Sequence, residues 1–140
     1  MTFYAVIDTN VLVSAILSKK SDSATVKIIK AIVDGKIVPL VHEEILNEYS
    51  DVLNRDKFHL KRSTIEKFLR LFEIYGVEII PRKTDEVFSD IDDKIFYEVA
   101  IGKQDSYLVT GNLRHYPNRD FVVTPAKMIS IIENESDREI

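Results

Sequence analysis

The segment Phe-Tyr-Ala-Val-Ile-Asp-Thr-Asn at residues 3–10 decides the fold of this chain. Its five apolar or aromatic residues predict a buried strand that runs directly into the side chains of Asp8, Thr9 and Asn10. The apolar residues at 11–17 can then begin a helix. In an open parallel sheet, the carboxyl ends of the strands form the ligand-binding edge. Asp8 is therefore either a functional carboxylate at that edge or a cap of the next helix.

Strands and helices alternate along the rest of the chain. Apolar spacing predicts helices at 24–33, 42–54, 62–75 and 92–101 and after Thr124-Pro125, with strands at 37–41, 77–80, 107–109 and 121–123. Residues 63–66 form a capping-box pattern, and Pro39 predicts that its strand lies at an edge or is short. The alternation predicts an α/β fold with a parallel sheet covered on both faces. We expect one domain over residues 1–133 and a polar tail at 134–140.

Composition excludes several classes of protein. The 140 residues are 45% hydrophobic, which suits a single core, and no apolar run approaches the ~20 residues of a membrane span. No basic region precedes Phe3, so we expect no secretory signal. Because there is no cysteine, disulfides, thiolate chemistry and zinc–cysteine sites are excluded. We expect a cytoplasmic protein that does not engage a membrane.

The charge is acidic overall and uneven along the chain. A net charge of −4 argues against a passive nucleic-acid binder, although a cluster of metal-binding carboxylates would also lower the net charge. Residues 54–70 nevertheless hold six basic side chains against two acidic ones. This segment is either a contact for phosphates or an ordinary solvated helix face.

Polar residues gather where the predicted sheet ends. Asp8 follows the first strand, an aspartate-rich turn precedes the fourth strand, and an amide follows that strand; the later residues are Asp90, Asp92, Asp93, Thr110 and Asn112. Glu48 lies at the margin of the apolar face of its helix, about 100° from the centre of that face, where it can bend over the sheet edge or remain a surface glutamate.

Carboxylates gathered in this way repel one another unless a divalent cation neutralises them. A set dominated by oxygen ligands favours Mg²⁺ or Mn²⁺ over zinc, and such ions serve phosphodiester or phosphoryl chemistry. Of three histidines without paired ligand spacing, His115 is the most interesting because its loop borders the predicted site; Arg114 beside it could meet a phosphate. There is no glycine-rich phosphate loop and no G-x-S-x-G nucleophile elbow.

Four motifs in order resemble the PIN domain. They are Asp8-Thr9-Asn10, the segment 44–53 around Glu48, the segment 90–100 around Asp93, and Leu108-Val109-Thr110-Gly111-Asn112. The resemblance covers residues 3–132, and the chain is similar in particular to bacterial PIN proteins that act as toxins of toxin–antitoxin pairs, relatives of the VapC toxins.

The resemblance implies a three-layer α/β/α domain with a mostly parallel five-stranded sheet, and a ribonuclease that depends on Mg²⁺ or Mn²⁺. Its acidic site maps onto Asp8, Glu48 and Asp93 as metal ligands, with Asn112 at a fourth catalytic position. Supporting roles map onto Thr9, Asn10, Asp92 and Thr110, and RNA contacts are expected from Lys57, Lys61, Arg62 and Arg114. The resemblance also implies a homodimer and an antitoxin partner.

The chain departs from the family pattern at two positions. Asn112 stands where aspartate is common and brings no negative charge, and Ser106 stands where this branch often has aspartate. Asp93 fits the family spacing better than Asp92, which is then free to cap the helix, while Thr9 or Asn10 takes the cap of the first helix. Two alternatives stay open: a PIN-like module that binds RNA or protein without cleaving, and a phosphoaspartyl enzyme with Asp8 as nucleophile.

Overall fold

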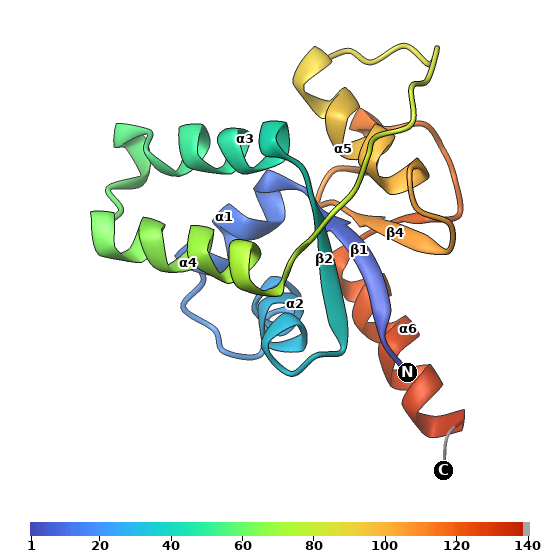
Figure 1. Cartoon of the computed structure of the whole chain (residues 1–140). Coiled ribbons are helices and arrows are strands. Elements are labelled where there is room, and N and C mark those ends of the chain that lie inside the picture. The colour runs from blue at the N-terminus through green and yellow to red at the C-terminus, as the bar shows by residue number, and fades with distance from the viewer. Residues whose placement is uncertain (139–140) are drawn as a thin grey trace.

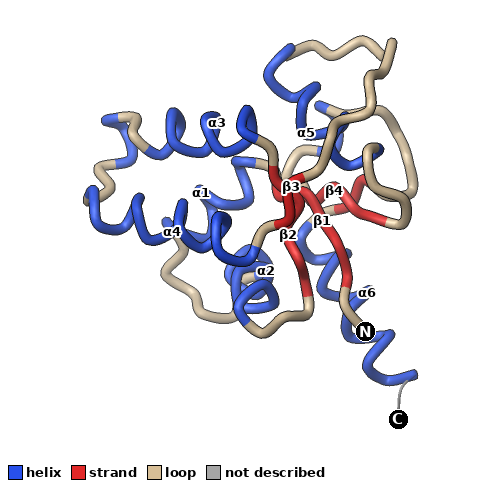
Figure 2. The backbone as a smooth tube through the Cα atoms, viewed as in Figure 1, coloured by secondary structure: helices blue, strands red, loops and turns tan. Residues whose placement is uncertain are grey.

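The computed structural model describes residues 1–138, and the side chains of residues 1–135. Over this part of the chain, a five-stranded parallel sheet is flanked by six helices in three layers (Figures 1 and 2). The strands are β1 (Phe3–Ile7), β2 (Ile37–Val41), β3 (Val77–Glu78), β4 (Ser106–Val109) and β5 (Val122–Val123). The helices are α1 (Thr9–Leu17), α2 (Ala24–Val33), α3 (Glu43–Leu53), α4 (Arg62–Tyr75), α5 (Lys94–Ile101) and α6 (Pro125–Arg138).

The order of the strands creates a crevice beside β1. The sheet runs β3-β2-β1-β4-β5, and every pair is parallel. The chain moves outward from β1 to β2 and β3, and then crosses through α5 to the other side of β1. In Figure 1, α1, α3 and α4 lie on one side of the strands and α5 on the other. Ligands of open α/β sheets bind where the strand order reverses, which here is between the carboxyl ends of β1 and β4.

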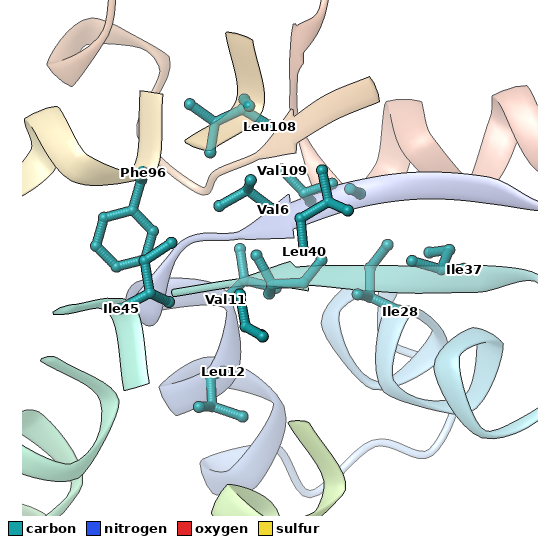
Figure 3. Close-up of a cluster of buried hydrophobic side chains, with 14 of the residues drawn as sticks. Val6, Val11, Leu12, Ile28, Ile37, Leu40, Ile45, Phe96, Leu108 and Val109 are labelled. Carbon is teal, nitrogen blue, oxygen red and sulfur yellow. The ribbon is translucent and has the colours of Figure 1, made fainter. Parts of the chain in front are cut away.

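The core is continuous across the sheet and both helical layers. Val6, Leu40 and Leu108 come from three neighbouring strands and are fully buried. Helical side chains pack against them, including those of Leu12, Ile28, Ile45 and Phe96 (Figure 3). Each central strand is buried on both faces, as parallel strands between helices require. No helix within residues 1–138 combines the length and the apolar character needed to cross a bilayer.

Two of the predicted strands differ from the structure. Pro39 predicted a strand at an edge or a short one; β2 lies inside the sheet, so the edge position is wrong, and the strand has five residues. The proline is tolerated because β3 pairs only with Leu40 and Val41, and no strand lies beside Pro39 on that side. β3 is correspondingly shorter than the predicted strand at 77–80, ending at Glu78.

Two helix ends also differ. The capping box at 63–66 is wrong, because α4 begins at Arg62 with Lys61 as its N-cap and no side-chain cap bond. Glu66 instead pairs with Arg62, 3.2 Å away on the exposed face of the helix. At the other end of the chain, α6 continues to Arg138 and thus includes most of the stretch expected as a polar tail. Residues 139–140 lie outside the described part.

Candidate active site between the ends of β1 and β4

A pocket of about 360 Å³ opens at the carboxyl end of β1. Five carboxylates reach it from three parts of the chain: Asp8 after β1, Glu48 on α3, and the segment that carries Asp90, Asp92 and Asp93 before α5. Its other lining residues come from α1, α3, the turn after α3, α5 and the loop after β4: Thr9, Asn10, Val13, Ser14, Val52, Phe58, Phe96 and His115. The pocket therefore unites the first three acidic motifs of the sequence.

Asp8 is held by a network of hydrogen bonds rather than serving as a cap. Its side chain is only 5% exposed. Its Oδ2 atom accepts hydrogen bonds from the hydroxyls of Thr110 (2.8 Å) and Tyr116 (3.0 Å) and from the amide of Asn10 (3.3 Å). Burial raises the pKa of this carboxyl, and the Thr110 and Tyr116 bonds partly offset that rise. Asp8 occupies the N-cap position of α1, but its side chain makes no cap hydrogen bond.

The residues after Asp8 also do not cap α1, contrary to the sequence expectation. Asn10 instead accepts a hydrogen bond from the backbone N–H of Gly111 (3.0 Å), which joins the start of α1 to the end of β4. The Thr9 hydroxyl is buried beside the pocket with no hydrogen-bond partner. Both side chains thus lie at the site, and Asn10 supports Asp8 directly.

Glu48 is positioned by its neighbour Tyr49. The buried Tyr49 hydroxyl donates a hydrogen bond to the carbonyl of Ile7, the last residue of β1. This bond holds α3 against the end of β1. The residue before Tyr49, Glu48, then lines the pocket. Burial raises the pKa of Glu48, and the negative charge of Asp92 raises it further. Glu48 thus reaches the pocket from the margin of the apolar face of its helix.

Asp93 is a partly buried acid of the pocket whose pKa is strongly raised. Its side chain is 14% exposed. Burial, followed by the negative charges of Asp8 and Asp90, raises its pKa to about 6. Asp92 does not cap this segment as expected; Asp90 does so, because its Oδ1 accepts the backbone N–H of Asp92 (3.0 Å). Asp92 is exposed and contributes charge at the rim of the pocket.

Asn112 reaches the site through His115. Its side-chain amide lies 2.9 Å from Nε2 of His115, and Nδ1 of the same ring lies 3.3 Å from Oδ2 of Asp93. His115 lines the pocket, whereas Asn112 stands behind the ring. The fourth motif therefore meets the first directly, through the bond from Thr110 to Asp8, whereas its Asn112 meets Asp93 by way of His115.

The expected RNA contacts divide into two groups. Lys57 and Lys61 are exposed, and Nζ of Lys57 lies 5.1 Å from the ring centroid of Phe58, which lines the pocket. Arg62 is exposed but paired with Glu66. Arg114 lies outside this pocket and borders a separate hollow of about 250 Å³ with Tyr116 and Arg119. Of these four residues, Lys57 lies beside a side chain of the pocket lining, and Arg114 lines a different hollow.

Tyr116 is a site residue that the sequence patterns did not reveal. Its buried hydroxyl bonds Asp8, and burial together with the charges of Asp8 and Asp93 raises its pKa far above the usual range. An aromatic residue beside a loop histidine carries no sequence signal for this role. Ser106, noted as a departure from the family pattern, has a structural role: its hydroxyl donates to the carbonyl of Ala100 (2.7 Å) and ties β4 to α5.

The donor set suits a hard divalent cation. Several carboxylates with raised pKa values share one pocket, and the buried Oδ2 of Asp93 has no hydrogen-bond partner. An ion would relieve both conditions. Within the described side chains, no three His, Asp or Glu residues already enclose a metal position. The chemistry of the lining thus suits a divalent ion.

Comparison with known families extends over most of the chain. Residues 4–114 match the PIN domain, a stretch that contains β1 through β4 and every acid of the pocket. In a comparison with curated proteins, none matches this sequence. Members of the matched family are generally nucleases. The strand order, the acids at the switch point and the family match agree, and this chain belongs to the PIN domain family.

Proposed function

We propose that this PIN domain is an endoribonuclease that hydrolyses RNA phosphodiesters with Mg²⁺ or Mn²⁺ held by Asp8, Glu48 and Asp93. The observation that carries the proposal is the meeting of these acids, each with a raised pKa, in one pocket at the switch point of the sheet. Nuclease is the general activity of the family. Isolated surface carboxylates would have neither the shared pocket nor the mutual repulsion.

The protein side chains have separable tasks in this proposal. A bound ion supplies an activated water and offsets the charge on the phosphate. Thr110, Tyr116 and Asn10 hold Asp8 in one orientation through their bonds to Oδ2, and the bonds from Thr110 and Tyr116 partly offset the rise in its pKa that burial causes. The exposed Lys57 and Lys61, in the connection between α3 and α4, would hold the RNA backbone, because ammonium groups pair with phosphates without reading sequence.

The test is cleavage of several single-stranded and structured RNAs by the purified protein with Mg²⁺, with Mn²⁺ and with a chelator. We expect cleavage only with metal, and a loss of at least about 100-fold in Asp8→Asn and Asp93→Asn, since each removes charge from the ion site. Asp22→Asn, an exposed acid remote from the pocket lining, is the matched control and should cut like the wild type. Equal cutting by wild type and Asp8→Asn would identify a contaminating nuclease.

A second candidate is a module of this fold that binds RNA or a protein without cleaving. The uncharged Asn112 and the lack of a ready-made three-ligand metal cage among the described side chains favour it. Calorimetry with Mn²⁺ separates the two, because a pocket that binds no ion at millimolar concentration cannot be a metal-dependent nuclease.

The resemblance of the sequence motifs to those of bacterial PIN toxins is the basis for a proposal about the cellular role of the domain. We propose that the domain is the cytoplasmic toxin of a toxin–antitoxin pair, acting as a homodimer and restrained by a small antitoxin. Expression of the wild type should then arrest growth while expression of Asp8→Asn does not, and the product of an adjacent reading frame should relieve the arrest. Unchanged growth with the active wild-type nuclease would remove the toxin role and leave the nuclease proposal standing.

A further inference from the structure

His115 is held between two residues of the candidate active site. The short 3-10 turn η3 (Leu113–His115) places it at the pocket, with its side chain 44% exposed. One ring nitrogen, Nε2, lies 2.9 Å from the side-chain amide of Asn112. The other, Nδ1, lies 3.3 Å from Oδ2 of Asp93. The ring thus links the fourth motif to the third.

The contact between His115 and Asp93 is not a well-formed hydrogen bond. Oδ2 of Asp93 is buried and has no hydrogen-bond partner, although Nδ1 is close to it. Two ligands of one ion, each about 2.1 Å from it and 90–110° apart, are separated by about 3.0–3.4 Å. The observed 3.3 Å falls within that interval. The distance thus suits two neighbouring ligands of one ion as well as a direct ion pair between the two groups.

Asn112 can set the ring in the state that such a ligand needs. The nitrogen and oxygen of a side-chain amide can exchange places when the amide group rotates by 180°. Oδ1 of Asn112 can therefore lie 2.9 Å from Nε2 of His115 and accept a hydrogen bond from its N–H. The lone pair of the imidazole then resides on Nδ1, which faces Asp93. Histidines that bind metals commonly donate their second N–H to such an acceptor.

We propose that His115 binds the metal ion directly through Nδ1 beside Asp93, and that Asn112 is a positioning residue that orients the ring. The inference rests on the proposed metal site and adds a nitrogen ligand to it. The proposal accounts for the uncharged Asn112 in the fourth motif, since the ligand there is the imidazole of His115 and not the side chain of Asn112. Imidazole is a better ligand for Mn²⁺ than for Mg²⁺. This centre should therefore discriminate in favour of Mn²⁺.

The test uses Mn²⁺ alone, without RNA. Pulsed electron paramagnetic resonance of the Mn²⁺-loaded protein should show the ¹⁴N coupling of a directly bound imidazole. His115→Gln should abolish that coupling and weaken Mn²⁺ binding in calorimetry by about tenfold or more, with a smaller effect on Mg²⁺. Asn112→Leu should weaken Mn²⁺ binding by about tenfold and leave the coupling detectable, whereas Asn112→Gln should restore part of the affinity.

His59→Asn is the matched control. His59 is an exposed histidine outside the pocket lining, and asparagine tolerates its left-handed backbone, φ 49°. This variant should keep both the nitrogen coupling and the Mn²⁺ affinity.

The outcomes separate this inference from the nuclease proposal. Mn²⁺ binding without nitrogen coupling, or coupling that survives in His115→Gln, overturns the histidine ligand and leaves the nuclease intact. Nitrogen coupling in a protein that cuts no RNA supports the histidine ligand and overturns the nuclease. Absence of any Mn²⁺ binding overturns both.

Discussion

At the scale of the residue, the pocket acids differ in how their charge is supported. Asp8 is the more buried acid, and three hydrogen bonds to its Oδ2 stabilise the ionised form. Asp93 has no comparable support at its buried Oδ2, and its pKa rises to about 6. An acid whose pKa is raised by folding lowers the stability of the folded protein when it ionises. The metal-free domain therefore carries a cost at neutral pH that a cation would offset.

The first prediction concerns Asp93 and pH. Between its unfolded pKa of 3.8 and its folded pKa of about 6, the folded state binds more protons than the unfolded state. The free energy of unfolding of the metal-free protein therefore falls as pH rises from about 4 to 6, by about 1–3 kcal/mol from this residue, and stays low above that range. Asp93→Asn should remove the part of this decline that Asp93 causes and stabilise the metal-free protein at pH 7.5. Chemical denaturation of the wild type and the variant at pH 5 and 7.5, in the presence of a chelator, measures these free energies of unfolding.

Asp22→Asn serves as the control and should keep the wild-type pH dependence. A wild-type stability that does not fall between these two pH values, or an Asp93→Asn protein less stable than wild type at pH 7.5, would contradict the electrostatic account. Burial of Asp8 and Glu48 acts in the same direction, so some pH dependence should remain in the variant.

Sequence patterns located these acids better than their partners. Asp8 and Thr110 directly follow apolar strands, so parallel topology alone brings them to one edge. The place of Glu48 at the margin of a helix face left two readings open, and the resemblance to the PIN domain singled it out. The bonds from Tyr116 and the contact of His115 with Asp93 depend on how one loop turns back over the edge, which no local pattern encodes.

At the scale of the element, the segment that follows β3 packs against the C-terminal end of α5. Its backbone follows the helix closely: the N–H of Arg82 bonds the carbonyl of Glu98 (2.9 Å), and the N–H of Thr84 bonds the buried Glu98 carboxylate (2.9 Å). Gly102 ends α5 at this crossing. A Cβ there would lie 2.4 Å from the backbone oxygen of Ile80. Since α5 follows directly after Asp93, this crossing helps to position the acid.

The second prediction is that Gly102→Ala destabilises the protein by about 1–3 kcal/mol, because the added carbon must displace backbone rather than a flexible side chain. Equilibrium denaturation measures the loss. Gly35→Asn is the comparison: residue 35 has φ +78°, a Cβ added there would meet nothing within 4 Å, and asparagine accepts that backbone. It should change stability by less than about 1 kcal/mol. Equal losses in both variants would show that the crossing is not tight.

Periodicity predicted the helices because each buries one apolar stripe, and their bounds agree with the structure to within a few residues. Periodicity failed to predict the ends of elements that are set by contacts with other parts of the chain. β3 stops at Glu78 because it pairs only with the end of β2. The capping-box pattern failed because the helix already begins at Arg62, so Ser63 lies inside α4 and cannot be its N-cap, and Glu66 pairs with the Arg62 side chain.

At the scale of the whole molecule, an acidic domain presents basic residues beside its acidic pocket. Lys57 and Lys61 lie in the connection between α3 and α4, and Phe58 of that connection lines the pocket. Lys27 and Lys30 lie on α2, at a separate hollow that α6 also borders. Basic side chains near the pocket would draw a phosphate backbone toward the acids in spite of the net charge of −4.

The third prediction uses this distribution. The double change Lys57→Ala with Lys61→Ala should weaken RNA binding and lower the magnitude of the salt dependence, the slope of log affinity against log salt, by about 1–2. The double change Lys27→Ala with Lys30→Ala removes the same charge elsewhere and should leave the slope nearly unchanged. Fluorescence anisotropy with inactive Asp8→Asn protein avoids cleavage during the titration. Equal effects from both pairs would mean that only net charge matters.

The central claim is that acids from three parts of the chain meet to hold a divalent ion. Anomalous diffraction from crystals soaked in Mn²⁺ tests it most directly, because it locates the ion without reference to activity. We expect a manganese peak within the pocket, bounded by Asp8, Glu48 and Asp93 and lost in crystals of Asp8→Asn. A pocket without a peak at saturating Mn²⁺, or manganese bound only elsewhere on the surface, would contradict it.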